Sequence, residues 1–343
     1  MPEFELNGRF LGDGHPPLVI AEIGINHDGD FQKAKQMVTD AHNSNAECVK
    51  FQSHIIDDEM IENDVIPGNA DESIWSIMKR CAFSEEQESE LKEYTEKLGM
   101  IYLNTPFSRA AADRLDRMKI SAFKIGSGEC NNYPLIEHIS KFKKPVIMST
   151  GMNSIQSIKK SVDIFEKYKI PFALLHVTSL YPTPYDKVRL GALSELRNEF
   201  PNAIIGLSDH SLGNYTCFAS IALGASIIEK HFTSNKNWPG PDISLSIDSN
   251  ELNELIIGSR AIFASLGGRK DILNEESITS NFAYSSVVSI SDIKKDELFT
   301  KENIWVKRPG TGEIRASEFE KIINKKAKTD INKNMQLKWD MID

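Results

Sequence analysis

Short apolar runs recur along most of the chain, and they alternate with longer stretches in which apolar residues return every three or four positions. The short runs are apolar on both faces, which is the pattern of strands buried in a parallel sheet. They predict eight strands, over residues 18–23, 47–51, 100–103, 122–125, 145–148, 172–176, 203–206 and 226–229.

The longer stretches have the periodicity of amphipathic helices, predicted over residues 31–43, 85–98, 110–118, 155–168, 188–200, 214–223 and 250–266. Ser108 and Asn153 are suited to cap two of them. Eight strand–helix units predict an α/β fold, a closed (β/α)8 TIM barrel. An open doubly wound sheet is the competing arrangement, but the glycine-rich dinucleotide turn is absent after the first strand.

The pattern changes after the last predicted helix. Gly267, Gly268 and a charged stretch indicate a linker, and short β-type segments follow at 286–290 and 304–306, with a turn at 294–297. The only longer helical pattern there covers 316–324. We therefore expect three parts, with a catalytic barrel over residues 1–268, a linker over 269–284 and a small β-rich domain over 285–343.

Composition excludes some function classes. The net charge of -9 over 343 residues argues against a nucleic-acid-binding surface. No apolar run approaches the ~20 residues of a membrane span, and the first residues lack the pattern of a signal peptide. The four cysteines are scattered without metal or redox spacing, so we expect reduced thiols in a cytoplasmic protein.

Polar residues follow every predicted strand, where barrel enzymes carry their working groups. Lys50 and Lys124 each end an apolar run, where a lysine is desolvated unless an anion meets it. That anion could be an internal partner, Glu22 or Glu129. A bound phosphate or carboxylate is the favoured interpretation, because hydroxyls and glycine amides crowd the same loops.

Two histidines, His210 and His231, follow the seventh and eighth strands, which are neighbours in a barrel. Either alone would be a hydrogen-bonded core residue, but together they can share a divalent cation and leave positions open. Such a site suits Mn²⁺ or Mg²⁺ better than structural zinc. Glu22, Glu129 and Asp242 are expected to face the same pocket, for proton transfer or hydroxyl recognition.

Short motifs lie at or after the predicted strands, and they are AEIGINH at 21–27, VKFQ at 49–52, NTPF at 104–107, KIGSGE at 124–129, STGM at 149–152, YPTP at 181–184, LSDH at 207–210, EKHFT at 229–233 and GPD at 240–242. With these motifs in this order, the sequence resembles bacterial sialic acid (N-acetylneuraminate) synthases, a family of nonulosonate synthases, nearly from end to end. The segment at 305–312, WVKRPGTG, is similar to their C-terminal antifreeze-like (SAF) domain.

The resemblance implies a set of ligand contacts. Glu129 would be the essential carboxylate near the reacting carbons, acting with Glu22, Lys50 and Lys124. His210 and His231 would bind the metal, Mn²⁺ ahead of Mg²⁺ or Co²⁺. Phosphoenolpyruvate would be held by Lys50, Thr105, Lys124, Ser127, Ser149 and Ser208, and the sugar would be contacted by Glu22, Gln52, Asn69, Tyr181, Asp242, Phe282 and Arg308.

One position departs from the family pattern. Ser179 stands where many bacterial synthases carry an asparagine close to the ligand phosphate. Serine is a shorter donor, so this change bears on ligand affinity and not on the reaction class. The family also implies a domain-swapped homodimer, in which Arg308 of the partner subunit completes each site.

The implied activity is that of a transferase that condenses phosphoenolpyruvate with N-acetylmannosamine and releases phosphate by C–O cleavage, giving N-acetylneuraminate. A sister synthase could act on a 2,4-diacetamido-6-deoxy sugar, giving legionaminic or pseudaminic acid. The motifs at 66–70, 108–111 and 131–134 favour the N-acetylneuraminate branch. The same barrel could also belong to a catalytically inactive carbohydrate- or ice-binding protein, or to a metal-dependent hydrolase or aldolase.

Overall fold

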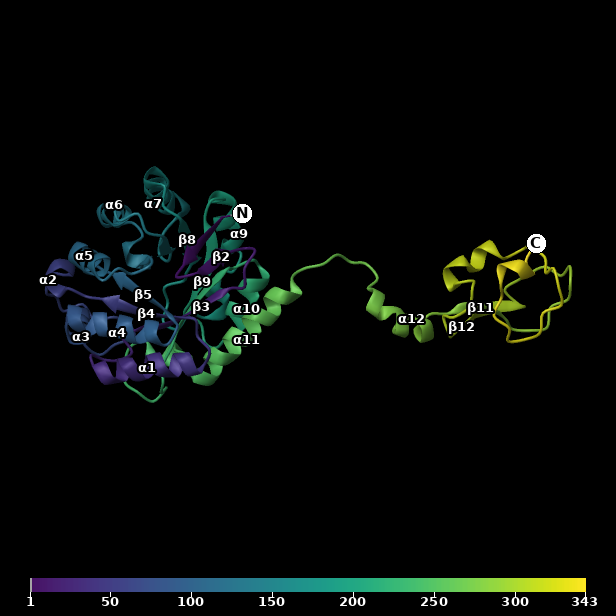
Figure 1. Ribbon diagram of the computed structural model, residues 1–343, viewed down its shortest axis with the longest axis horizontal. Coiled ribbons are helices and arrows are strands. Elements are labelled where there is room, and N and C mark those ends of the chain that lie inside the picture. The colour runs from purple at the N-terminus through teal and green to yellow at the C-terminus, as the bar shows by residue number, and fades with distance from the viewer. Residues whose placement is uncertain (1) are drawn as a thin grey trace. The chain divides into compact units, whose positions relative to one another are not determined.

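The computed structural model describes residues 2–343 and divides the chain into two compact units, Met1–Gly267 and Gly268–Asp343 (Figure 1). Each unit has a hydrophobic core of its own. The first unit carries the parallel strands and the second the short β-type segments, so the two can be described separately.

Eight parallel strands form the centre of the first unit, in the order β5-β4-β3-β10-β9-β8-β7-β6. The two end strands of this order, β5 and β6, lie against each other, so the sheet nearly closes on itself. The predicted TIM barrel is therefore confirmed. The strands are β3 Leu18–Gly24, β4 Cys48–Ser53, β5 Ile101–Pro106, β6 Phe123–Ile125, β7 Val146–Ser149, β8 Phe172–His176, β9 Ile204–Asp209 and β10 Ile227–His231.

Helices surround this sheet, and most of them bury an apolar face against it. They are α1 Phe31–Asn43, α2 Ile56–Glu59, α3 Ile74–Cys81, α4 Glu85–Lys97, α5 Arg109–Arg117, α6 Tyr133–Ser140, α7 Ile155–Tyr168, α8 Tyr185–Val188, α9 Ala192–Glu199, α10 Tyr215–Ala222 and α11 Ser249–Ser265. Among the helices of residues 2–343, none combines the length and the apolar character that crossing a bilayer requires.

The helix caps agree with the sequence at one predicted position and differ at the other. The Ser108 hydroxyl accepts a hydrogen bond from the backbone N–H of Ala111 and caps α5, as predicted. Helix α7 is capped by Ser154 and not by Asn153, because the Ser154 hydroxyl is the group that meets the free N–H of Ser157. The expected cap was therefore wrong by one residue.

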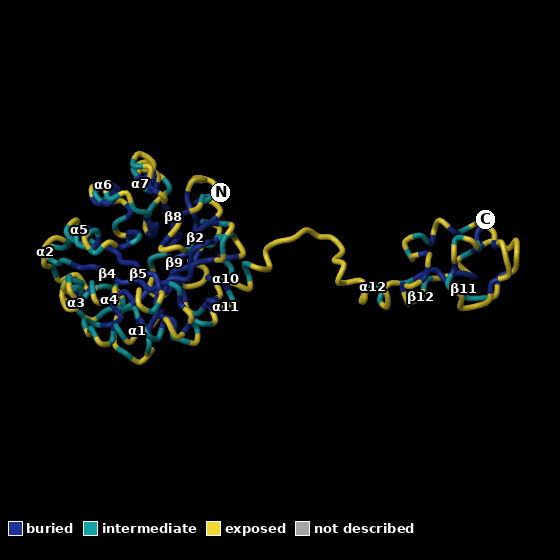
Figure 2. Tube along the Cα trace, viewed as in Figure 1, coloured by how far each residue is buried: buried dark blue, intermediate teal, exposed yellow. Residues whose placement is uncertain are grey.

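Alternate residues of each barrel strand point into the barrel, and their character changes along its axis. Near the strand starts they are apolar and form one closed cluster, which includes Leu18, Cys48, Ile147 and Ile227. Figure 2 shows the strands as the most buried part of this unit. Two or four positions further along, the inward residues become polar, and they are Glu22, Lys50, Thr105, Lys124, Ser149, Ser208 and Glu229.

An N-terminal hairpin closes the opposite end of the barrel. Strands β1 Glu3–Leu6 and β2 Arg9–Gly12 are antiparallel, and the turn residues Asn7 and Gly8 both have positive φ. Phe4, Leu6 and Leu11 join the apolar cluster inside the barrel. The sequence analysis did not predict this hairpin, although an Asn-Gly pair is a strong turn signal.

The second unit is small and rich in short strands. Strands β11 Ser286–Ser289 and β12 Ile304–Lys307 pair antiparallel and lie over a core that includes Val287, Ile293 and Phe299. A 3-10 helix covers Ala316–Lys321, where a longer helix was expected. The stretch 269–284, which was expected to be a linker, contains helix α12 Ser277–Ala283.

The hairpin's burial generates a stability prediction. Leu11 is only 1% exposed, so Leu11→Ala should lower the free energy of unfolding of the barrel by about 2–5 kcal/mol, because it leaves a cavity in the sealed layer. Phe10→Ala, at a neighbouring position that is 45% exposed, should change it by no more than about 0.5 kcal/mol. Urea denaturation followed by far-UV circular dichroism measures both, and equal effects would contradict the sealing role.

Candidate active site

A cavity of about 260 Å³ opens at the carboxyl ends of the barrel strands. Most of the residues that the sequence analysis proposed for ligand binding line it. Phe282 and Arg308 belong to the second unit, and Glu129 is not among the lining residues. The proposed residues that do line the cavity are Glu22, Lys50, Gln52, Asn69, Thr105, Lys124, Ser127, Ser149, Ser179, Tyr181, Ser208, His210, His231 and Asp242.

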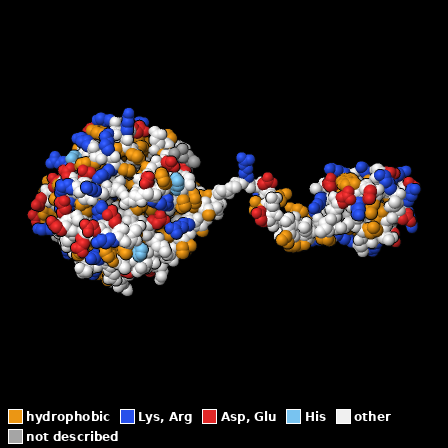
Figure 3. Space-filling view, viewed as in Figure 1, with side chains coloured by type: hydrophobic (Ala, Val, Ile, Leu, Met, Phe, Trp, Pro, Cys, Tyr) orange, Lys and Arg blue, Asp and Glu red, His pale blue; other side chains and the backbone are white. Residues whose placement is uncertain are grey.

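Four charged side chains form the floor of the cavity. Lys50 Nζ lies 2.7 Å from Glu22 Oε2 and 3.9 Å from Glu229 Oε1, and Lys124 Nζ lies 3.7 Å from the same Glu229 oxygen. Each of the four residues is at most 5% exposed. On the face of the barrel seen in Figure 3, by contrast, acidic and basic side chains are interspersed over the surface. The concentrated charge lies inside the cavity.

Burial shifts the pKa values of these groups in opposite directions. It raises the pKa of Glu22 to about 7, although Lys50 opposes the shift, and it lowers the pKa of Lys124 to about 8. Burial alone would also raise the pKa of Glu229, but the charges of Lys124 and Lys50 hold it below its usual range. Near neutral pH two lysine charges therefore face one full and one partial carboxylate charge, which leaves an excess that favours an anion.

The internal pairing of Lys50 and the anion-binding interpretation are compatible. Glu22 is the partner of Lys50, as one interpretation of the sequence expected, whereas Lys124 is closest to Glu229 and not to Glu129. Glu229 was missed as a cavity residue. The signal that could have found it is the alternation along β10, where Ile227, Glu229 and His231 share the inward face.

Hydroxyl groups accompany the two lysines. Lys50 Nζ donates to Thr105 Oγ1 at 3.1 Å, and Lys124 Nζ donates to Ser149 Oγ at 2.7 Å. Ser208 Oγ donates to Glu229 Oε1 at 3.0 Å. Hydroxyl groups that already orient the lysines can turn to the oxygens of a phosphate or a carboxylate when one is bound.

A narrow cradle lies beside them, made by Ser127, Gly151 and Ser179. The backbone N–H of Gly151 donates to Ser127 Oγ at 3.0 Å, and the buried Ser179 Oγ has no hydrogen-bond partner. A Cβ at position 151 would lie 2.4 Å from Ser179 Oγ and 2.8 Å from Ser127 Oγ, so only glycine fits. An unsatisfied buried hydroxyl that lines the cavity is a free donor for a ligand oxygen.

The two histidines lie side by side in the same cavity, with ring centroids 5.4 Å apart. His210 Nδ1 is 3.0 Å from the carbonyl oxygen of Thr178 and donates to it, which leaves the Nε2 lone pair free. His231 Nδ1 has no hydrogen-bond partner and lies 3.6 Å from Asp242 Oδ2. Burial lowers the pKa of both rings, that of His231 to about 4, so both are neutral at pH 7.

Neutral imidazoles with free lone pairs fit a divalent cation. Within residues 2–343, no group of three or more His, Cys, Asp and Glu side chains is arranged to hold a metal. Two histidines alone would leave the remaining coordination positions to water and substrate, as in catalytic sites. The donor set therefore suits a catalytic cation and not a closed structural one.

Two other predicted residues, Asn69 and Glu129, each have a polar partner. Asn69 Nδ2 donates to the carbonyl oxygen of Pro241 at 3.0 Å and lies 3.4 Å from Asp242 Oδ1, which joins the loops that follow β4 and β10. Glu129 accepts a hydrogen bond from Asn132 Nδ2 at 2.5 Å, and partial burial raises its pKa. Its role beside the reacting carbons stays a prediction.

Two charged residues adjacent to the site in sequence face away from it. Lys230 Nζ lies 2.6 Å from Asp209 Oδ2 and also donates to the carbonyl oxygen of Ser211, and none of these three residues lines the cavity. Asp209 and Lys230 are therefore a buried structural pair on the outer side of the barrel wall.

Comparisons with known proteins bear on the whole chain. A profile described as the NeuB family matches residues 37–271, and a profile described as the SAF domain matches residues 284–343. An uncharacterized protein of Methanocaldococcus jannaschii is 39% identical over 342 residues, which is 99% of this chain and 98% of that one.

Two further relatives have named activities. The N,N'-diacetyllegionaminic acid synthase of Campylobacter jejuni is 35% identical, over 90% of this chain and 95% of that one. The crystal structure of an N-acetylneuraminic acid (sialic acid) synthetase from Leptospira borgpetersenii, in complex with citrate, superposes with a TM-score of 0.75 at 31% identity, over 81% of this chain and 94% of that one.

The charged floor predicts pH-dependent anion binding. Sulfate, which stays a dianion through the neutral and alkaline range, should bind the wild type less tightly as pH rises through about 8, because Lys124 loses its proton there. Lys124→Met should weaken binding at pH 7 about tenfold or more and flatten the pH dependence. Isothermal titration calorimetry measures both effects.

The matched control is Lys144→Met, which removes a lysine paired with Asp116 outside the cavity and should leave sulfate affinity unchanged. A Lys124→Met protein that binds sulfate as tightly as the wild type would remove Lys124 from the anion site.

Proposed function

This chain belongs to the NeuB family, and we propose that it condenses phosphoenolpyruvate with an open-chain N-acyl amino sugar to give a nine-carbon nonulosonic acid. The resemblance to nonulosonate synthases with an SAF domain, which the motifs predicted, is confirmed by the family match and the named relatives. The observation that carries the proposal is the convergence of Lys50, Lys124, His210 and His231 on one cavity.

Phosphoenolpyruvate carries a phosphate and a carboxylate, which need two regions of positive charge. We propose that Lys124, Ser149 and the cradle of Ser127 and Ser179 take one group, and that Lys50 with Thr105 takes the other. Support comes from the hydrogen bonds that already join each lysine to its hydroxyl partner. Preorganised donors in a site that excludes water stabilise developing negative charge more strongly than water does.

The reaction forms one carbon–carbon bond and breaks one carbon–oxygen bond. C3 of phosphoenolpyruvate attacks the aldehyde carbon of the sugar, and a water molecule adds to C2, where positive charge develops. The resulting tetrahedral carbon expels phosphate by C–O cleavage and becomes the keto group. A divalent cation, when bound by His210 and His231, would supply Lewis-acid polarisation of the aldehyde oxygen.

Two carboxylates are available for the proton transfers. Glu22 has a pKa of about 7 in this cavity, so it can accept a proton from the attacking water and return it near neutral pH. Glu129 is proposed from the family resemblance to act close to the same carbons. Lys50 and Lys124 neutralise the charge of the departing phosphate, which lowers the barrier to its expulsion.

For the sugar, we propose N-acetylmannosamine, in line with the sequence motifs and with the sialic acid synthetase among the related structures. A 2,4-diacetamido-6-deoxy sugar is the second candidate, favoured by the 35% identity to an N,N'-diacetyllegionaminic acid synthase. In both cases Gln52, Asn69, Tyr181 and Asp242 would contact the sugar, because they line the cavity.

The quaternary structure and the metal are further parts of the proposal. We propose Mn²⁺ as the cation, with Mg²⁺ and Co²⁺ as substitutes, and a cytoplasmic homodimer. Phe282 is 60% exposed and Arg308 is also exposed on the second unit, so both are free to contact another surface. In a swapped homodimer, Arg308 of the partner subunit would reach the N-acyl group of the sugar.

The activity can be tested on the purified protein. With phosphoenolpyruvate, Mn²⁺ and N-acetylmannosamine, we expect the mass spectrum of the product to show a nine-carbon acid, and one inorganic phosphate to be released for each acid formed. In ¹⁸O-labelled water, the released phosphate should stay unlabelled. Labelled phosphate would contradict C–O cleavage. Turnover of the 2,4-diacetamido-6-deoxy sugar alone would support the second candidate. Ligand binding without phosphate release, whichever sugar is added, would favour an inactive carbohydrate-binding protein.

The cation site can be tested separately. His210→Ala should lower kcat/KM about a hundredfold or more and weaken Mn²⁺ binding, because several kcal/mol of polarisation are lost. Electron paramagnetic resonance of free Mn²⁺ measures binding without turnover. His42→Ala, at an exposed position on α1, is the control and should change neither quantity. Full activity and full Mn²⁺ affinity in His210→Ala would remove His210 from the site.

A further inference from the structure

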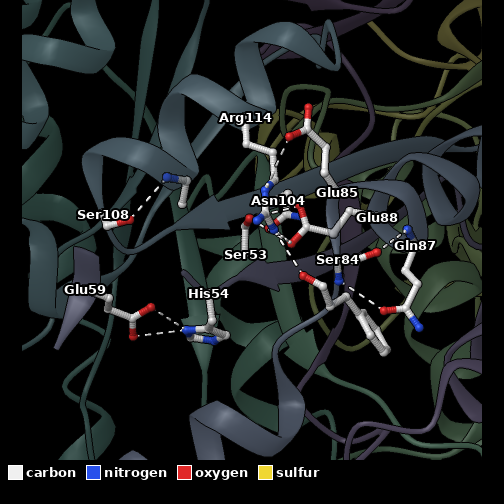
Figure 4. A network of polar contacts seen from close by, with 12 residues as sticks. Ser53, His54, Glu59, Ser84, Glu85, Gln87, Glu88, Asn104, Ser108 and Arg114 are labelled. Carbon is white, nitrogen blue, oxygen red and sulfur yellow. Dashed lines mark hydrogen bonds and ion pairs between the residues drawn. The ribbon is translucent and has the colours of Figure 1, made fainter. Parts of the chain in front are cut away.

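Two polar side chains that follow β4, His54 and Glu59, contact each other and do not line the cavity themselves (Figure 4). His54 Nδ1 lies 2.9 Å from Glu59 Oε2 and 3.0 Å from Glu59 Oε1, and His54 Nε2 lies 3.1 Å from Gln52 Oε1. The side chains of His54 and Glu59 are 2% and 7% exposed. The next link, Gln52, does line the cavity.

The chemistry of the partners determines the direction of each hydrogen bond. The Glu59 carboxylate can only accept, so His54 Nδ1 carries a proton and donates it. The Gln52 oxygen can also only accept, so His54 Nε2 is placed to donate to it. Both ring nitrogens of His54 therefore face oxygen acceptors, those of Glu59 on one side and that of Gln52 on the other. Because the oxygen of Gln52 faces His54, its amino group faces Glu22, and Nε2 donates to Glu22 Oε1 at 3.1 Å.

We infer that His54, held by Glu59, is a positioning residue that selects which end of the Gln52 amide faces Glu22 and the sugar. The two ends of an amide are almost equal in size, so packing alone cannot select between them. A turned amide would place its oxygen against the Glu22 carboxylate and lose a donor from the cavity. The inference rests on the proposed function, in which Gln52 and Glu22 contact the sugar.

The residues packed around His54 and Glu59 hold these two side chains in one arrangement. The His54 ring stacks on Phe107 with centroids 4.8 Å apart, and Phe107 lines the cavity. The short helix that carries Glu59 is tied to the start of α5, where Asp58 Oδ2 accepts the backbone N–H of Ala110 at 2.8 Å. The position of Glu59 is therefore set by the barrel's helices and not by a free loop.

The same pairing explains a glycine at the end of β3. Gly24 has a φ of 52°, and a Cβ there would lie 2.9 Å from Glu22 Oε1 and 3.2 Å from Gln52 Nε2. A side chain would therefore strike the Gln52–Glu22 hydrogen bond itself. The barrel strand is irregular between Glu22 and Gly24, where its register to β4 shifts.

One other titratable group lies close to His54 on the neighbouring strand end. Burial, and secondly the charge of His54, lowers the pKa of His27 to about 3, so His27 is neutral. Glu59 is the acidic group in contact with His54. Burial is the main cause that raises the pKa of Glu129, and the charge of Glu59 adds to it.

A pair of substitutions at His54 tests the inference, because amide nitrogens can replace one ring nitrogen at a time. His54→Asn keeps a donor near Nδ1 and loses the donor to Gln52, so the KM for the amino sugar should rise on the order of tenfold. The KM for phosphoenolpyruvate and the midpoint of thermal unfolding should change little. His54→Gln keeps a donor near Nε2 and should recover most of the sugar affinity.

A double-mutant cycle separates positioning from structure. In a Gln52→Ala background, His54→Asn should have no further effect on the KM for the sugar, because His54 acts through Gln52. An equal rise in both backgrounds, or no rise in the wild-type background, would overturn the assignment. A wild type that releases no phosphate with any sugar overturns the proposed function as well, whereas an active wild type without coupling overturns only the role of His54.

A second pair at Glu59 keeps the test decisive if His54→Asn fails to fold. Glu59→Gln can donate its amide to His54 Nδ1 and leave the proton on Nε2, so the KM for the sugar should stay within about twofold of the wild type. Glu59→Leu has a similar volume and no polar group, so it should raise that KM as His54→Asn does. Equal KM values in the two Glu59 variants would count against the inference.

Discussion

Charge buried inside a closed barrel is the constraint on which the rest of this structure depends. Lys50, Lys124, Glu22 and Glu229 share one layer from which water is largely excluded, and none of them could remain ionised there alone. The negative charges of this layer do not fully cancel its positive charges near neutral pH, because Glu22 is only partly ionised. The surplus positive charge attracts an anionic substrate. The hydroxyl groups, the paired histidines and the Gln52 amide are arranged around this layer.

The apolar runs predicted the barrel because its strands are buried on both faces, so local composition and tertiary environment agree. Agreement fails where an element is short or is stabilised by distant residues. Helix α2 has four residues and none of them is buried, and α6 has only eight residues. The hairpin β1–β2 has a recognisable Asn-Gly turn, but its apolar residues are covered only by strands that come later in the chain.

The candidate site could be predicted as a set of residues but not as an arrangement. Polar residues after each strand indicated the mouth of the barrel, since that rule depends only on strand direction. Glu229 and Lys230 are adjacent in sequence, yet one faces the cavity and the other faces outward to Asp209. The period of two along β10 separates them once the inward register is known. The orientation of the Gln52 amide depends on His54 and Glu59, and no sequence pattern encodes it.

The hairpin that seals the barrel has a consequence for biosynthesis. Ribosomes make a chain in the N- to C-terminal direction, so Phe4, Leu6 and Leu11 are made long before one of their packing partners, Ile227. Until then the layer of apolar side chains inside the barrel is incomplete. Contacts of such long sequence separation also form slowly. The segment that closes the mature barrel is thus made early but is fully covered only late in translation.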